Sequence, residues 1–208
     1  GVLAPESGCV LLGGNALPTS AGAHADAGAA APSGREALAL ADVPRLVGFV
    51  GQTPYLFNRT LRENLTLGVL QASDERLSDV LRSVGLGEKL ASLKDGLNTV
   101  VGETGVGFSG GEAHRIALAR VLVAETPIVV VDEPFSALDP ETERDLLDTL
   151  LRVCADRTLV VITHHLAYIE RFDQVVFIED GRLSLHGTPA DLLQSSSRFR
   201  ELVSFDRA

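Results

Sequence analysis

A short apolar segment that ends in two carboxylates is the strongest constraint on how this chain can fold. Residues 128–131 read Ile-Val-Val-Val, and Asp132, Glu133 and Pro134 follow directly. A run this short and this rich in β-branched residues predicts a strand that is buried on both faces, as in a parallel sheet. The two carboxylates would then lie at the carboxyl end of the strand, where open α/β sheets place their ligand sites. Such a pair suits a site for Mg²⁺ and phosphate, and the simpler alternative is a strand with a solvated acidic end.

Predicted strands and helices alternate along most of the chain. This order predicts an α/β fold with a largely parallel central sheet, a helical subdomain and a small antiparallel β portion, formed by a hairpin around Asp180-Gly181. Ser73 is a candidate cap for one of the helices. The expected strands are 9–12, 45–50, 128–131, 158–163, 175–179 and 182–185. The expected helices are 61–67, 74–84, 85–93, 112–124, 141–154, 188–193 and one that begins at 197. Residues 18–34 are small or polar without periodicity and are expected to form a surface loop.

The bulk composition excludes several classes of protein. At 208 residues, with 45% hydrophobic residues, the chain is long enough to bury a substantial core. Its formal net charge of −10 argues against a nucleic-acid-binding surface. Cys9 and Cys154 are far apart and have no metal-ligand spacing, which fits a reducing compartment. No apolar run approaches the roughly 18 residues that a membrane span needs.

A glycine-rich segment precedes the expected helix 112–124. Ser109, Gly110 and Gly111 stand directly before this helix. Glycine allows a ligand to approach the backbone closely, and the free N–H groups and dipole of a helix N-terminus favour an anion. The segment therefore suits phosphate, and the alternative is a helix cap with a flexible approach.

Five segments in order resemble the ATP-binding domain of ABC transporters. They are FSGGE at 108–112, RIALAR at 115–120, VVVDEP at 129–134, SALD at 136–139 and VITH at 161–164. The resemblance covers nearly the whole chain and implies that residues 1–208 are a partial ABC ATP-binding domain. Residues 53–112 would form the helical subdomain with the signature motif, and residues 113–208 the C-terminal part of the ATPase core.

The resemblance also implies roles for individual residues, with ATP and Mg²⁺ as cofactors. Residues 108–112 match the signature motif, so Ser109, Gly110, Gly111 and Glu112 would contact the γ-phosphate of ATP held by the second domain of a head-to-tail dimer. The family usually has Gln at the last position, so Glu112 would add negative charge near phosphate.

The remaining implied roles concern the ends of the expected strands. Asp132 matches the aspartate that supports Mg²⁺, and Glu133 the general base that polarises the attacking water. His164 matches the switch histidine that contacts the γ-phosphate. Gln52 matches the glutamine that reaches Mg²⁺ and water and links the site to the membrane domain. Asp139 lies in the loop that crosses the dimer interface, where the resemblance implies that it contributes to ATP binding. Residues 102–104 resemble the segment that touches the coupling helices.

One family motif is absent from these residues. No G-x-x-x-x-G-K-S/T phosphate loop occurs in the 208 residues. In the family this loop and its helix precede the segment equivalent to residues 1–8, so we expect the chain to begin just after the phosphate-binding helix. These residues alone should then bind ATP weakly and hydrolyse essentially none. In these residues alone, the part of the core that the phosphate-binding loop and its helix cover in the family should also be exposed to solvent.

The segments 60–65 and 187–193 resemble exporter-type domains, and FSGGE with THHL at 163–166 resembles the bacterial thiol exporters of cytochrome bd assembly. The implied partners are a transmembrane domain of the same transporter and a second ATP-binding domain, with no nucleic acid. The implied location is the cytoplasmic face of the bacterial inner membrane. Two alternatives stay open: a soluble ABC ATPase of DNA repair or translation, and a non-catalytic half that completes a partner's ATP site.

Overall fold

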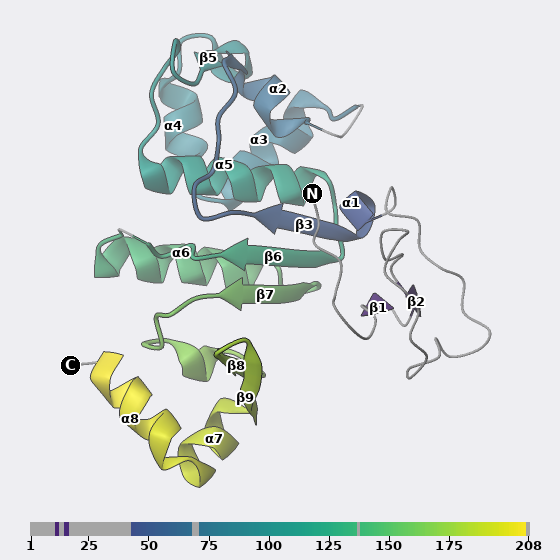
Figure 1. Ribbon diagram of the computed structural model, residues 1–208. Helices are drawn as coiled ribbons and strands as arrows, with labels where there is room; N and C mark the ends of the chain where they lie inside the picture. Colours follow the sequence, from purple (N-terminus) through teal and green to yellow (C-terminus); the bar gives the residue numbers. More distant parts are fainter. Residues whose placement is uncertain (1–10, 13–14, 17–42, 68–70, 137, 207–208) are drawn as a thin grey trace.

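Three parallel strands form the centre of the molecule (Figure 1). The computed structural model describes residues 11–12, 15–16, 43–67, 71–136 and 138–206. The strands are β3 (Val47–Val50), β6 (Ile128–Asp132) and β7 (Thr158–Ile162), and β6 lies between the other two. Val50 pairs with Val131, and Asp132 pairs with Ile162, so the carboxyl ends of the three strands are nearly level. The mixed α/β fold with a parallel central sheet is therefore confirmed.

The other strands form small antiparallel pairs. The pair β8 (Val175–Glu179) and β9 (Arg182–Gly187) is the predicted hairpin. Its turn residues Asp180 and Gly181 have φ values of 48° and 71°, as the tight turns that match strand twist require. The remaining pairs are β1 (Leu11–Leu12) with β2 (Asn15–Ala16), and β4 (Arg59–Thr60) with β5 (Val100–Val101).

Helices α2–α5 form a separate layer on the side of β3, and α6 lies behind the sheet (Figure 1). Ser73 caps α3 by accepting a hydrogen bond from the amide of Arg76, as predicted. The α-helices are α1 (Val43–Leu46), α2 (Leu61–Leu65), α3 (Asp74–Ser83), α4 (Gly87–Ser92), α5 (Gly110–Val123), α6 (Pro140–Val153), α7 (Pro189–Ser195) and α8 (Ser197–Asp206). Two short 3₁₀ turns are η2 (Gly96–Asn98) and η3 (Ile169–Arg171).

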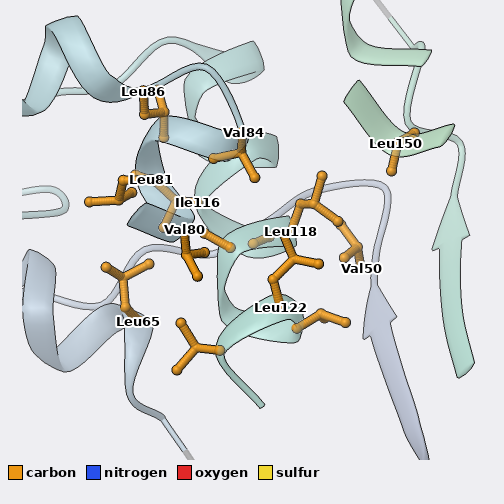
Figure 2. Packing of buried hydrophobic residues seen from close by; sticks show 14 of the residues in the cluster. Val50, Leu65, Val80, Leu81, Val84, Leu86, Ile116, Leu118, Leu122 and Leu150 are labelled. Carbon is orange, nitrogen blue, oxygen red and sulfur yellow. The ribbon is translucent and has the colours of Figure 1, made fainter. Parts of the chain in front are cut away.

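Helix α5 lies between the helical layer and the sheet, and its side chains form much of the core. Figure 2 shows Ile116, Leu118 and Leu122 of α5 among residues of α3 and near Val50 of β3. Of the eight residues from Ile116 to Val123, all except Arg120 are buried. A helix that packs on several sides has to be apolar around most of its circumference, and this explains why residues 116–123 are apolar apart from Arg120.

The two faces of the sheet differ in burial, which corrects one prediction. Val129 and Val131 are buried, whereas Ile128 and Val130 are only half-buried. The prediction that this strand is buried on both faces is therefore wrong for the described residues, because their helical core covers one face. On the opposite face, Phe49 and Val160 flank Val130 and are 61% and 42% exposed.

Several predicted boundaries also differ from the structure. Arg45 and Leu46 lie in α1 and not in the first parallel strand, because Pro44 has no N–H for a sheet and its φ suits a helical turn. Helix α5 begins at Gly110, two residues earlier than predicted, because Ser109 is its cap. The expected boundary between residues 112 and 113 falls within α5, and the division into subdomains stays a prediction. Cys9, Val10 and residues 18–34 lie outside the described residues.

Candidate functional site

The structure brings four predicted site residues to one edge of the sheet. Asp132 ends β6, and Glu133 follows it. Gln52 lies two residues after the end of β3, and His164 lies two residues after the end of β7. Because the strands are parallel neighbours in nearly level register, their carboxyl ends form a common edge. Gln52, Asp132, Glu133 and His164 therefore follow the ends of three adjacent strands, as expected from the sequence.

Glu133 and His164 are in direct contact. Nδ1 of His164 lies 2.9 Å from Oε1 of Glu133, and since a carboxylate only accepts, the imidazole donates this hydrogen bond. The side chain of Glu133 is 20% exposed, whereas that of His164 is 71% exposed. Oε2 of Glu133 is buried and has no hydrogen-bond partner among the described residues. One carboxylate oxygen is thus held by the imidazole, and the other is a buried acceptor without a partner among the described residues.

The backbone of Glu133 adopts an unusual conformation. Its φ is 46°, in the left-handed region that non-glycine residues adopt at a cost of about 1–2 kcal/mol. Its amide donates to the carbonyl of Ile162 at 2.8 Å, which ties the turn after β6 to the end of β7. Strained backbone of this kind clusters at functional sites, where the surrounding structure maintains it. Here the strained residue carries the carboxylate that contacts His164.

The residues expected to support Mg²⁺ have suitable chemistry. Asp132 and Gln52 offer a carboxylate and an amide oxygen, the hard oxygen ligands that Mg²⁺ prefers. Among the described residues, no group of three or more His, Cys, Asp or Glu side chains could hold a metal ion alone. Mg²⁺ is commonly held by one or two protein ligands, with phosphate oxygens and water completing its coordination.

The glycine-rich segment forms the N-terminus of α5. Ser109 caps the helix by accepting from the amide of Glu112, and Glu112 accepts in return from the amide of Ser109 at 2.8 Å. A Cβ atom added to Gly110 would meet no atom within 4 Å among the described residues. Figure 1 shows α5 running antiparallel to β6, so this N-terminus lies on the side of the sheet's carboxyl edge. The exposed amides of this N-terminus are suited to an anion.

The charge of Glu112 is compensated within the chain. Nζ of Lys89, from α4, lies 3.1 Å from Oε1 of Glu112. Burial raises the pKa of Glu112, but the hydrogen bonds from the Ser109 amide and from Lys89 outweigh it, and the pKa lies below its ordinary value. Sequence reasoning identified Glu112 as an added negative charge and missed Lys89, because no local pattern connects residues 23 positions apart.

Asp139 has a local structural role in this chain. It is the cap of α6, and its carboxylate accepts from the side chain of Thr142 at 2.6 Å and from the amides of Thr142 and Glu141. These hydrogen bonds, the one from the Thr142 hydroxyl first, lower the pKa of Asp139. A Cβ on Gly111 would lie 3.8 Å from Leu138 and from Thr142, so the starts of α5 and α6 are neighbours. Contact of Asp139 with ATP stays a prediction.

A buried polar network connects α5 to the segment after Gln52, and sequence reasoning did not find it. Arg120 donates to the backbone oxygen of Asn64 at 2.7 Å and to its Oδ1 at 2.8 Å. Asn64, which is fully buried, also accepts from the amide of Phe57 and donates to the Phe57 carbonyl, both at 2.9 Å. The aromatic rings of Tyr55 and Phe57 are stacked edge to face and are 56% and 41% exposed.

A cavity of about 830 Å³ lies between α4, α5 and α6, and Lys89, Glu112 and Arg115 are among its lining residues. It lies beside the signature segment (residues 108–112) and away from the Glu133–His164 pair.

Among the described residues, no helix is long and apolar enough to cross a membrane.

Comparisons with known proteins give a consistent result. A family model described as "ABC transporter" matches residues 1–136. The chain is 42% identical over 182 residues to the Bacillus subtilis glutathione/L-cysteine transport system ATP-binding/permease protein CydD, covering 87% of this chain and 32% of the relative. It is 41% identical over 152 residues to the Mycobacterium tuberculosis mycobactin import ATP-binding/permease protein IrtB, covering 73% and 26%. The human mitochondrial potassium channel ATP-binding subunit is 40% identical over 159 residues, covering 76% and 22%.

The similarity extends to a solved structure, that of a bacterial Atm1-family ABC exporter with ATP bound. The TM-score is 0.72 with 34% sequence identity, and the match covers 81% of this chain and 30% of the other. The chain thus spans about a third or less of the length of each of these proteins.

Proposed function

Because this chain belongs to the ABC transporter family, we propose that it is part of the ATP-hydrolysing domain of an exporter-type transporter and that hydrolysis drives transport. The observation that carries the proposal is the position of Gln52, Asp132, Glu133 and His164 after three adjacent strands, with Glu133 and His164 in contact at 2.9 Å. Phosphoryl transfer to water depends on positioning and charge neutralisation more than on covalent chemistry. These side chains would supply the positioning, and the Mg²⁺ that Asp132 and Gln52 would hold would neutralise phosphate charge.

Each residue has a separate task in this proposal. The free Oε2 of Glu133 orients a water molecule and accepts its proton, while His164 holds Oε1 and so fixes the carboxylate. Asp132 and Gln52 provide oxygen ligands for Mg²⁺, which neutralises phosphate charge when bound. The N-terminus of α5 at Ser109, Gly110 and Gly111 faces the phosphate of ATP held by a second domain, and the amides of Gly110 and Gly111 donate to it.

We propose two partners for this domain, and both rest on relatives longer than this chain. The first is a second ATP-binding domain arranged head to tail, so that each signature segment faces the other's nucleotide. The second is the transporter's transmembrane domain, which places the ATPase at the cytoplasmic face of the membrane. The exposed Tyr55 and Phe57, three and five residues after Gln52, support a docking surface at this end of the domain.

The phosphate-binding loop is assigned in this proposal to part of the polypeptide outside these 208 residues. The open face of the sheet around Phe49 and Val160 supports it, because parallel sheets are covered on both faces in complete α/β domains.

We propose low-molecular-weight thiols as the transported class, since a relative of 42% identity is named for glutathione and L-cysteine transport. Uptake of labelled glutathione by inverted vesicles that contain the full-length transporter tests this assignment.

The test of hydrolysis uses the full-length polypeptide that contains this chain. We expect Glu133→Gln to lower kcat for ATP by roughly 10²–10⁴-fold, the contribution of a positioned general base. Glu141→Gln is the matched control, because Glu141 is an exposed glutamate in the first turn of α6. Equal rates for wild type and Glu133→Gln contradict the proposal. A wild type that binds ATP without hydrolysing it favours a non-catalytic half that completes a partner's site.

A further inference from the structure

The short helix α4 is joined to the signature segment by one side chain. Lys89 extends from α4 to Glu112 in the first turn of α5, where its Nζ lies 3.1 Å from Oε1 and 3.3 Å from Oε2. The same Nζ lies 4.9 Å from the centre of the Phe108 ring, a cation–π distance. Lys89 thus contacts residues on both sides of Ser109, Gly110 and Gly111.

The pair is partly shielded from solvent. The side chains of Lys89 and Glu112 are 30% and 26% exposed, so their charges interact more strongly than those of a surface pair. Glu112 is tied into the capping box by its hydrogen bond with the Ser109 amide. Its carboxylate therefore has a fixed position within one turn of the amides that would receive a phosphate.

A carboxylate at this position creates an electrostatic problem. The N-terminus of α5 attracts anions through its amides and dipole, and an uncompensated negative charge in the first turn opposes this attraction. An ammonium group at 3.1 Å neutralises that charge locally. Lys94, the other lysine of the chain, is exposed and forms no ion pair with Glu112 among the described residues.

We propose that Lys89 is a positioning residue for ATP binding, which neutralises Glu112 and holds the signature segment in an anion-accepting state. The inference rests on the proposed function, because it takes the phosphate of ATP as the anion. Lys89 acts through Glu112 and Phe108 and does not itself contact the reacting atoms. Its loss should therefore weaken the apparent affinity for ATP more than it slows the chemical step.

The experiment measures ATP hydrolysis by the full-length transporter as a function of ATP concentration. We expect Lys89→Met to raise KM for ATP about tenfold, as one uncompensated charge at short range would, with a smaller change in kcat. Adding Glu112→Gln should return KM close to the wild-type value, because a neutral amide needs no counter-charge. Lys89→Arg should keep KM near wild type, and Lys94→Met is the matched control.

The outcomes separate this inference from the function on which it rests. An unchanged KM in Lys89→Met overturns the inference, and so does a raised KM that Glu112→Gln fails to restore, since Lys89 would then act through folding. In both cases hydrolysis by wild type and its loss in Glu133→Gln leave the proposed function intact. A wild-type transporter without hydrolysis overturns both. Normal KM in Lys89→Arg shows that the site is folded when position 89 is changed.

Discussion

The contact between Arg120 and Asn64 allows a quantitative prediction. Arg120 makes two hydrogen bonds to the buried Asn64, and this residue holds the Phe57 segment in turn. Replacement by Met keeps the length of the side chain and removes both donors. The Asn64 carbonyl would lose this donor in a site without solvent access, while its Oδ1 would keep the Phe57 amide.

The size of the effect follows from these contacts. A hydrogen bond to a charged group contributes about 1.5–3 kcal/mol, so two bonds contribute about 3–6 kcal/mol. Part of this is offset because the guanidinium no longer has to be buried, and burial already lowers the pKa of Arg120. We therefore expect a net loss of about 2–4 kcal/mol in the local stability of the Phe57–Asn64 segment. This corresponds to roughly 30- to 1000-fold faster amide exchange there.

Hydrogen exchange followed by mass spectrometry on the full-length protein measures this loss in peptides that cover residues 55–65. Arg82→Met is the matched control, because Arg82 pairs with Asp79 on the exposed surface of α3, where an ion pair contributes at most about 1 kcal/mol. If peptides 55–65 exchange equally fast in the two variants, the network does not hold this segment and the reasoning fails.

Two further predictions concern single positions. Gly110→Ala should leave the melting temperature within a few degrees of wild type, because the new methyl group meets no described atom and Ala favours helix. It should nevertheless slow ATP hydrolysis about tenfold or more, since the methyl group occupies space needed by phosphate. Equal rates of hydrolysis in the variant and the wild type would contradict this. Burial and then the nearby Asp206 raise the pKa of Glu143, although His165 opposes them. Since the folded state favours the protonated form of Glu143, the stability of the wild type should fall as pH rises from the ordinary pKa through the raised one. Glu143→Gln should therefore melt at a higher temperature than wild type at pH 7 and lose this advantage near pH 4. A difference in melting temperature that does not change with pH would count against it.

Local pattern was sufficient to predict most elements of this fold. The apolar run 128–131, the cap at Ser73 and the Asp180-Gly181 turn each depend on interactions within a few residues, and the structure contains all three elements. The order of Gln52, Asp132, Glu133 and His164 after predicted strands was likewise sufficient to place them at one edge, because parallel strands end on the same side.

Tertiary structure alone decided what depends on distant parts of the chain. The half-burial of Val130 depends on which faces of the sheet the helices cover, and the apolar run of its strand contains no information about that. The pairs Lys89–Glu112 and Arg120–Asn64 join positions 23 and 56 residues apart. Their members are ordinary polar residues of helices until folding brings the helices together. Sequence thus determined which chemical groups lie at the edge of the sheet. The packing of α2 against α5 and the Lys89–Glu112 pair between α4 and α5 determined how the segment around Asn64 is held and how the charge of Glu112 is neutralised.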